Sequence, residues 1–332
     1  MVAKKIILAG SILVGMSLFS ACSSDKGNSM SQEGTVNIGI SQIASHSALD
    51  SAREGFIEAL ASKGFKEGEN LNLEIQNAEG DIPTSQMIAE SFISSDKDLI
   101  FTIGTPAAQA AFNTTKDTPI ITTAVTDAVQ AGLVKSKEKS GTNVAGTSDA
   151  APLEKQLKLI QEIVKDVKTI GVLYNTSEVN SEIQVKELKE LAKKNNIEVI
   201  TKGVSSVNDI SQSLDSILGD IDVLYTPADN LVASSMAIIV DKAIAKKVPV
   251  IGAEEAHVNS GALITEGINY KKLGFEAGIM AVEVLEGKDI KELSIKTSEE
   301  TELVINQDTL EKLSINIDEE IMSRAKVVKG GE

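Results

Sequence analysis

Val36-Asn37-Ile38-Gly39-Ile40 begins the part of the chain that settles its architecture, and the run Leu49–Leu60 completes that part. The first five residues form a largely β-branched run, which is typical of a buried strand. In the second segment apolar residues recur every three or four positions, as on one face of a helix, at Leu49, Ala52, Phe56, Ile57 and Leu60. Gly64 then ends the predicted helix. A buried strand followed by an amphipathic helix is the repeating unit of an α/β protein.

The same alternation continues as far as Gly146. The predicted strands are Leu71–Ile75, Asp98–Ile103, Pro119–Ala124 and Asn143–Gly146. Helices are predicted over Thr84–Ile93 and Ala107–Phe112, and Pro106 suits the first turn of the second one. Consecutive βαβ units of this kind predict a parallel sheet with helices on both faces.

A second series of strands and helices follows. Its predicted strands are Thr169–Tyr174, Glu198–Lys202, Val223–Thr226 and Val248–Gly252. Its predicted helices are Leu153–Val164, Glu182–Lys194, Val207–Leu218 and Val232–Ala245. Because a chain of 332 residues is longer than one hydrophobic core usually organises, the two series predict two α/β lobes.

The tail of the chain adds a predicted strand, a helix and a last strand, at Ala262–Ile268, Leu273–Leu285 and Glu302–Asn306. These elements must pack on sheets that are already formed, so we expect the first part in the first lobe and the last strand in the second. The predicted lobes are residues 35–148 with 257–290, and residues 149–256 with 291–332. Three crossings of the chain between the lobes would limit their relative motion to a hinge.

The N-terminal segment 1–21 has the pattern of a secretory signal peptide. Lys4 and Lys5 precede the apolar run Ile6–Phe19, which is too short to span a bilayer comfortably. The segment ends at Leu18-Phe19-Ser20-Ala21-Cys22, which resembles a bacterial lipobox, with Phe19 where leucine is more common. We therefore expect lipid on Cys22, followed by a small, polar, flexible tether over residues 22–34. The alternative is a transmembrane anchor that buries the cysteine.

The composition and the motif content of the chain argue against several classes of function. The formal net charge of −16 argues against nucleic acid, whose phosphates require basic patches. With one cysteine in the chain, no internal disulfide can form. The sequence contains none of the glycine-rich phosphate loops, the G-x-S-x-G motif or the H-E-x-x-H motif, and its two histidines lie far apart. We expect no catalytic residues, no metal site and no cofactor.

The candidate binding residues follow from one rule of parallel sheets. Ligands bind outside the carboxyl ends of the strands, so the polar residues just after each predicted strand are the candidates. They are Gln42, His46, Thr105, Pro106, Thr126, Asp127, Asn175, Asp229, Asn230 and Glu254. For Thr105 and Asp229 taken singly, capping of the following helix is an alternative role.

The charges at these strand ends indicate the ligand class. Asp127, Asp229, Glu254 and Glu255 are acidic, and no lysine or arginine occurs among these strand-end residues. A phosphate ester is therefore disfavoured. A zwitterion fits better, because its ammonium can face a carboxylate while its carboxylate accepts hydrogen bonds from hydroxyls and from the start of a helix.

Several motifs of the chain are similar to those of a known family. They include Gly104-Thr105-Pro106-Ala107-Ala108-Gln109, Gly146-Thr147-Ser148-Asp149, Tyr174-Asn175-Thr176-Ser177-Glu178-Val179-Asn180-Ser181 and Thr226-Pro227-Ala228-Asp229-Asn230. These motifs resemble those of ABC-transporter substrate-binding lipoproteins of the tryptophan/tyrosine-binding type. The resemblance is collinear and extends over the whole chain after Cys22. It implies the type I periplasmic-binding-protein fold, in which two Rossmann-like lobes with parallel sheets are joined by three hinge crossovers.

The resemblance also implies a function. The protein would capture an amino acid, with an aromatic one favoured, by hinge closure and deliver it to an ABC permease in the membrane. It would be a monomer outside the cytoplasm, held to the membrane through its N-terminal lipid alone. Thr105 and Thr126 would bind the α-carboxylate, helped by backbone N–H groups near Pro106 and Ala107. Asp229 would pair with the α-ammonium, near Asn230 and Glu254, and the remaining cleft would be lined by Gln42, His46, Asn175 and Ser181.

Two alternatives remain open at this point. The same fold could bind a nucleoside or another small ligand, or serve an extracellular sensor instead of a transporter. Aromatic residues make up 3% of the chain and tryptophan is absent, so no stacking platform is evident. Tyr174 and Tyr225 lie near strand ends, but core packing is the simpler role for both.

The lipobox resemblance gives a first prediction. Replacing Cys22 with alanine removes the thiol that would carry the lipid, so the protein should move from the membrane fraction to the medium or periplasm. Its affinity for ligand should not change, because residues 22–34 lie outside the predicted lobes. Cell fractionation beside a Ser23→Ala control tests this, and retention of the Cys22→Ala protein in membranes would contradict it.

Overall fold

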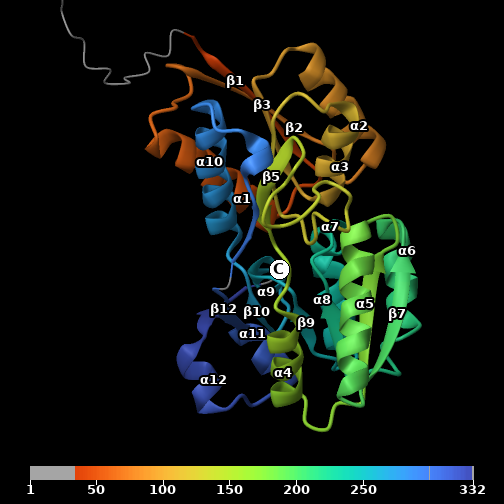
Figure 1. Cartoon of the computed structure of the whole chain (residues 1–332). Helices are drawn as coiled ribbons and strands as arrows, with labels where there is room; N and C mark the ends of the chain where they lie inside the picture. The colour runs from red at the N-terminus through yellow and green to blue at the C-terminus, as the bar shows by residue number, and fades with distance from the viewer. Residues whose placement is uncertain (1–33, 299, 331–332) are drawn as a thin grey trace, which may run out of the picture. The chain divides into compact units, whose positions relative to one another are not determined.

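The computed structural model of the chain describes residues 34–298 and 300–330. The predicted signal segment 1–21, Cys22 and the predicted tether as far as residue 33 lie outside the described residues. The described part contains two sheets, each forming one α/β lobe with its own helices, as predicted (Figure 1). No helix in residues 34–298 and 300–330 combines the length and the apolar character needed to cross a membrane.

The sheet of the first lobe has six strands in the order β11-β5-β4-β3-β1-β2, and every neighbouring pair is parallel. The strands are β1 (Val36–Gln42), β2 (Leu71–Asn77), β3 (Leu99–Ile103), β4 (Ile120–Thr123), β5 (Val144–Ser148) and β11 (Ile295–Thr297). The residues of β3, β4 and β5 are all buried. Such continuous burial is expected for strands covered on both faces.

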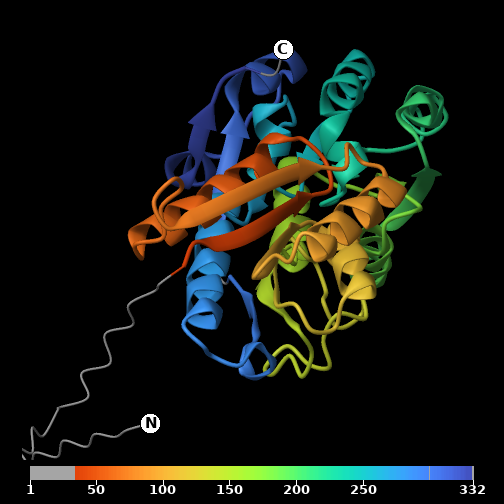
Figure 2. The ribbon, with the colours of Figure 1, turned by 90° about the horizontal axis from the view of Figure 1, so that it is seen from above.

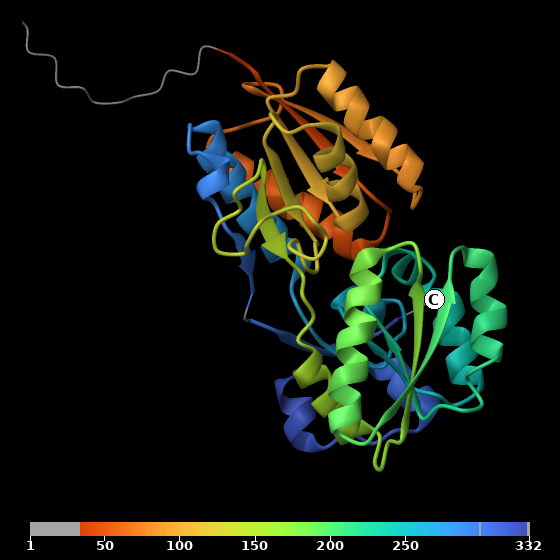
Figure 3. The ribbon, with the colours of Figure 1, turned by 45° about the vertical axis from the view of Figure 1, so that its right-hand side comes forward.

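Helices cover both faces of this sheet because the strand order reverses direction at β1. The helices are α1 (Ser47–Ser62), α2 (Ile82–Ser94), α3 (Thr105–Thr114) and α10 (Tyr270–Leu285). Right-handed crossovers in opposite directions place α1 on one face and α2 and α3 on the other. α2 and α3 pack side by side (Figure 2), across the sheet from α1 and α10 (Figure 3).

The sheet of the second lobe has seven strands in the order β13-β12-β10-β9-β8-β6-β7. They are β6 (Thr169–Asn175), β7 (Glu198–Val204), β8 (Val223–Thr226), β9 (Val250–Gly252), β10 (Ile264–Gly267), β12 (Glu302–Asn306) and β13 (Lys326–Val328). The pair β10–β12 is antiparallel and the other pairs are parallel.

The helices of this lobe also divide between the two faces of its sheet. They are α4 (Leu153–Ile163), α5 (Val179–Lys194), α6 (Val207–Asp215), α7 (Asn230–Ser234), α8 (Met236–Ala245), α9 (Glu255–Asn259), α11 (Gln307–Leu313) and α12 (Glu319–Arg324). Figure 3 shows α5 on the face opposite α6 and α8. The short 3-10 helix η1 (Ile290–Glu292) precedes β11 in the first lobe.

The chain passes between the lobes three times, after β5, after β10 and after β11, so the predicted crossovers are confirmed. The predicted lobe boundaries at residues 257 and 290 are wrong. β10 pairs with β9 and β12 in the second sheet, and β11 pairs with β5 in the first. Only the short helix α9 separates β9 from β10, and so short a connection keeps consecutive parallel strands adjacent. The second and third crossings therefore lie at residues 268–269 and 298–301.

The helix α10 returns from the second lobe and packs tightly on α1. Glycines at the contact let the two backbones approach closely. A Cβ atom at Gly274 would lie 1.8 Å from the carbonyl oxygen of Ala52, and one at Gly55 would lie 2.0 Å from that of Lys271. This packing fixes the start of α10, and with it the side chain of Tyr270, relative to the first lobe.

The close contact predicts that Gly274→Ala destabilises the protein by about 3 kcal/mol or more, because the added methyl group meets backbone that cannot move aside cheaply. Gly219→Ala is the matched control, since a Cβ atom there meets nothing within 4 Å. Denaturant unfolding of the two variants measures the difference. Equal midpoints for both variants would show that the helices can separate without cost.

Candidate ligand-binding site between the lobes

The carboxyl ends of strands from both sheets meet at an enclosed polar cavity. Its volume is about 10 Å³, which is room for about one water molecule. The residues that line it come from both lobes and from two crossovers. They are His46, Leu49, Ala124, Asp149, Asn180, Ala228, Asp229, Asn230, Glu254 and Tyr270.

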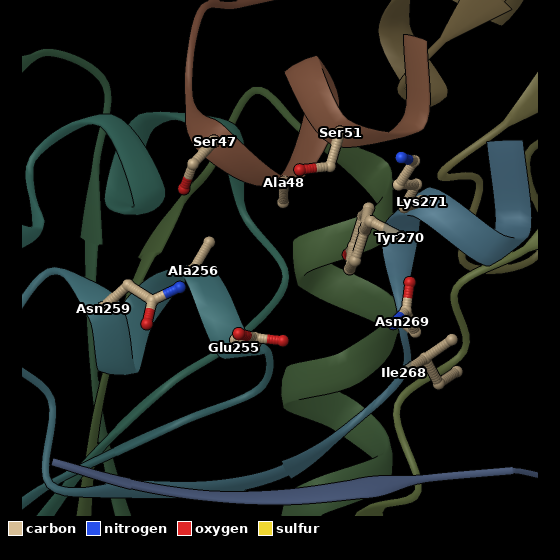
Figure 4. A pocket seen from close by; sticks show the side chains of 10 residues that line it. All are labelled: Ser47, Ala48, Ser51, Glu255, Ala256, Asn259, Ile268, Asn269, Tyr270 and Lys271. Carbon is tan, nitrogen blue, oxygen red and sulfur yellow. The ribbon is translucent and has the colours of Figure 1, made fainter. Parts of the chain in front are cut away.

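Two larger pockets adjoin this cavity. The first has a volume of about 150 Å³ and shares Tyr270 with the cavity. Figure 4 shows Tyr270 between the start of α1 and the crossover that carries Ile268 and Asn269, with α9 opposite. The second pocket, of about 410 Å³, shares Asn230 with the cavity and includes Gly80 of the first lobe and Ser206 of the second. The small cavity thus shares one lining residue with each of two larger pockets between the lobes.

A direct hydrogen bond joins the lobes beside the cavity. Nε2 of His46, which precedes α1, lies 3.3 Å from Oδ1 of Asn230. Asn230 is oriented by Glu178, whose Oε2 accepts from its Nδ2 at 2.6 Å. Burial lowers the pKa of His46, although the contacts with Asn230 and Asp50 oppose that shift.

Asp229 is buried at the start of α7 and accepts three hydrogen bonds from its own lobe. Oδ1 accepts from the backbone N–H of Val232 at 3.0 Å. Oδ2 accepts from the backbone N–H of Asn175 at 2.5 Å and from the Ser181 hydroxyl at 2.7 Å. Asp229 therefore caps the start of α7, which was the alternative role considered for it in the sequence analysis. The predicted residues Asn175 and Ser181 contact Asp229 through these hydrogen bonds and do not line the cavity.

Glu178 was not among the predicted site residues, yet it organises three asparagines. Its side chain is 4% exposed and accepts hydrogen bonds from Nδ2 of Asn175 at 3.1 Å, Asn180 at 3.1 Å and Asn230 at 2.6 Å. It precedes α5 by one residue, three positions after the end of β6. Its place just after a strand end was the signal that could have identified it.

Asp149 and Tyr270 were also missed, and they form a pair at the crossovers. Asp149 follows β5 and is 6% exposed. Its Oδ2 accepts from the Tyr270 hydroxyl at 2.7 Å, and its Oδ1 accepts from the Thr126 hydroxyl at 3.1 Å. Asp149 comes directly after a strand end, so the same rule could have selected it, whereas Tyr270 opens a helix and follows no such rule.

Glu254 precedes α9 and is 2% exposed. Its Oε1 lies 3.4 Å from Nε2 of the buried His257, whose Nδ1 lies 3.0 Å from the Thr226 hydroxyl. Burial raises the pKa of Glu254 to about 8 and lowers the pKa of His257 to about 3. At neutral pH both groups are therefore mainly uncharged in the ligand-free protein.

The electrostatics of the cavity are dominated by carboxyl groups. Burial, with a further contribution from the charge of Glu178, raises the pKa of Asp229 to about 7. Burial also raises the pKa of Asp149. No lysine or arginine is among the residues that line the cavity. The site therefore lacks a positive charge that would compensate ionised carboxylates.

The remaining predicted residues lie in two places. Thr105, Pro106 and Ala107 form the buried start of α3, where the Thr105 hydroxyl finds no hydrogen-bond partner among the described residues. A Cβ atom on the preceding Gly104 would lie 3.9 Å from Nδ2 of Asn230, so this helix start faces the cavity-lining asparagine.

Gln42 and Asp127 lie away from the cavity lining. The side chain of Gln42 bonds to the carbonyl of Ala44, to Asp50 and to Arg53, all within the first lobe. Asp127 accepts hydrogen bonds from the backbone N–H groups of Val129 and Gln130, both at 2.9 Å. Both side chains thus support local structure, and the predicted residues that reach the cavity are His46, Asp229, Asn230 and Glu254.

Comparison with known proteins places the chain among transport proteins. Residues 37–329 match the sequence model of the family described as "ABC transporter substrate binding protein". The tyrosine-binding protein of Clostridioides difficile is 51% identical over 93% of this chain and 91% of its own. The predicted resemblance is therefore confirmed at the level of the family.

Two solved structures are similar over 89% of this chain. A Streptococcus pneumoniae ABC domain in complex with L-Trp is 34% identical, matches over 100% of its length and gives a TM-score of 0.86. A ligand-free, open substrate-binding protein with adhesive properties from Clostridium difficile is 50% identical, matches over 99% of its length and gives 0.69. These likenesses confirm the predicted type I periplasmic-binding-protein fold. The open structure gives the lower TM-score although its sequence is the more similar of the two. This difference agrees with the direct contact between the lobes described above.

The raised pKa of Glu254 predicts how stability depends on pH. A carboxyl group whose pKa is higher in the folded state stabilises that state fully below its unfolded value, 4.5, and the contribution is lost as pH rises through about 8. Unfolding of the ligand-free protein should therefore become easier between these values. Glu254→Gln should flatten this dependence, whereas Glu255→Gln should not. A Glu254→Gln profile identical to that of the parent protein would show that Glu254 does not carry the effect.

Proposed function

The chain belongs to the ABC transporter substrate-binding proteins, and from that premise we propose that it captures an amino acid with an aromatic side chain between its lobes. Proteins of this family work outside the cytoplasm and pass a small molecule to a membrane permease. The proposal concerns the ligand class, the residues that bind it and the attachment of the protein to the membrane.

The observation that carries the proposal is the acidic cavity without a cationic side chain. Three of its lining residues, Asp149, Asp229 and Glu254, bear carboxyl groups that are buried together. Ionised carboxylates in such a site are stable only with a positive partner. A ligand ammonium group supplies that charge, which supports an amino acid and argues against a phosphate ester.

The opposite end of a zwitterion has a matching place at the start of α3. The first N–H groups of a helix have no partner within the helix and carry partial positive charge, which favours an anion there. The Thr105 hydroxyl, which has no hydrogen-bond partner within residues 34–298 and 300–330, adds a donor beside Pro106 and Ala107. Thr126, which already bonds to Asp149, lies at the end of the neighbouring strand. These groups support binding of the α-carboxylate by the first lobe.

The aromatic preference is supported by relatives and by one side chain. The relative from Clostridioides difficile is named for tyrosine, and the pneumococcal structure contains L-Trp. Tyr270 is the aromatic residue of the cavity lining. Tyr225 packs in the core with its hydroxyl on Gln156, and Tyr174 borders a different pocket. Tyr270 is thus the residue best placed to contact an aromatic ring.

Binding on this proposal requires the lobes to separate. A cavity of about 10 Å³ cannot hold an amino acid, whereas the adjoining pockets provide space once the His46–Asn230 hydrogen bond opens. The three crossovers allow a hinge motion, and a ligand that contacts both lobes favours the closed arrangement. Lipid on Cys22 would keep the monomeric protein near its permease during this cycle.

The absence of tryptophan from the chain makes the proposal easy to test. When excited at the red edge of indole absorption, the protein alone should give almost no fluorescence. The fluorescence emission of added L-tryptophan should therefore report binding directly, as a shift in wavelength that saturates. L-tyrosine should displace it, whereas adenosine and glucose should not. Failure of both aromatic amino acids to bind, or displacement by adenosine alone, would contradict the proposal.

A further inference from the structure

We propose that the α-ammonium group of the ligand is bound by the carboxyl groups of Asp149 and Glu254 together with the side-chain oxygen of Asn180. The family resemblance implied this role for Asp229. The inference rests on the proposed function and deepens it, because it assigns the specificity for an amino acid to residues at the junction of the lobes.

Asp229 is poorly suited to the role because its oxygens are already used. Both accept hydrogen bonds from within the second lobe, one from Val232 and the other from Asn175 and Ser181. An ammonium group bound there would compete with the cap of α7. Glu178 is occupied in the same way by three asparagine amides.

Glu254 and Asp149 keep free acceptor capacity toward the cavity. The Tyr270 hydroxyl lies near both carboxyl groups, and its hydrogen bond goes to Asp149. Asp149 accepts two hydrogen bonds, although a carboxylate has about four acceptor positions. Apart from the His257 ring nitrogen at 3.4 Å, Glu254 has no close ion pair in residues 34–298 and 300–330. Both residues line the cavity.

Asn180 supplies an independent sign that a donor belongs in the cavity. Its side chain is 4% exposed, and its Oδ1 has no hydrogen-bond partner among the described residues. The orientation of this amide is fixed, because its Nδ2 donates to Oε2 of Glu178 and to the carbonyl of Ala228, both at 3.1 Å. Turning the amide over would place oxygen against oxygen at both contacts. A buried acceptor of this kind calls for a donor.

The number and the type of these groups match an ammonium group. An –NH₃⁺ group has three donors and no acceptor, and Asp149, Glu254 and Asn180 can each offer it an acceptor. Asp149 lies on the first crossover, whereas Glu254 and Asn180 belong to the second lobe, so one ammonium group would join them across the junction. No group of three or more acidic, histidine or cysteine residues in the part of the chain that the structure describes could hold a metal ion. The geometry therefore favours an organic cation.

The test compares L-tyrosine with 3-(4-hydroxyphenyl)propionate, which lacks only the ammonium group. Glu254→Gln and Asp149→Asn should each lower the affinity for L-tyrosine about 30-fold or more, the scale for removing one partner of a buried charge pair. The affinity for the deamino compound should stay the same or rise. Glu283→Gln, at a half-buried carboxylate near the C-terminal end of α10 and outside these pockets, should change neither affinity. Asp229→Asn should affect both compounds alike, through the stability of α7.

The outcomes separate this inference from the proposed function. If the parent protein binds neither L-tyrosine nor L-tryptophan, the proposed function fails. If the parent protein binds L-tyrosine but Glu254→Gln and Asp149→Asn leave the ratio of the two affinities unchanged, the ammonium site is wrong. Selective loss of L-tyrosine binding in Asp229→Asn alone would return the role to Asp229.

A second measurement needs no variant. An ammonium group that binds Glu254 should ionise its carboxyl group, so the parent protein should release protons when it binds L-tyrosine near pH 7. Calorimetry in buffers of different ionisation enthalpy measures this release. The deamino compound should release none. Equal proton exchange with both compounds would overturn the inference even if every variant failed to fold.

Discussion

Burial of carboxyl groups at the junction of two lobes is the constraint on which this structure depends. Asp149, Glu178, Asp229 and Glu254 are each at most 6% exposed, and no lysine or arginine is among the residues that line the cavity beside them. The protein accommodates them in two ways. Glu178 accepts four hydrogen bonds and Asp229 accepts three, whereas burial favours the neutral form of Glu254. The second arrangement leaves a group that can gain a charge when a cation arrives.

The crossovers between the lobes bring several of these groups together. Asp149 lies on the first crossover and Tyr270 directly follows the second, so their 2.7 Å hydrogen bond links two of the three connections between the lobes. The glycine contact between α1 and α10 holds Tyr270 against the first lobe, and the network around Glu178 holds Asn180 and Asn230 in the second. Each half of the site is therefore held in place by contacts with its own lobe.

Much of this organisation could be predicted from the sequence, because buried strands and amphipathic helices have strong local periodicity. The rule about strand ends selected His46, Asp229, Asn230 and Glu254, which line the cavity in the structure. It could not identify Tyr270, which enters the cavity from a helix start that a long-range helix contact positions. It also could not rank the carboxyl groups, because only the structure reveals which oxygens already have donors. The lobe assignment of β10 failed for a related reason, since strand pairing is a tertiary property.

The distribution of charge in the site explains why a zwitterion suits it better than either half alone. A carboxylic acid without an amine would bring negative charge toward Asp149 and Glu254 and would leave Asn180 Oδ1 without a donor. An amine without a carboxylate would satisfy those acceptors but leave the start of α3 and the Thr105 hydroxyl unpaired. Because unpaired buried polar groups are costly, each truncated ligand meets a penalty in a different lobe. On the proposed assignment, a molecule that carries both charges at the spacing of an α-amino acid would therefore favour closure of the lobes most.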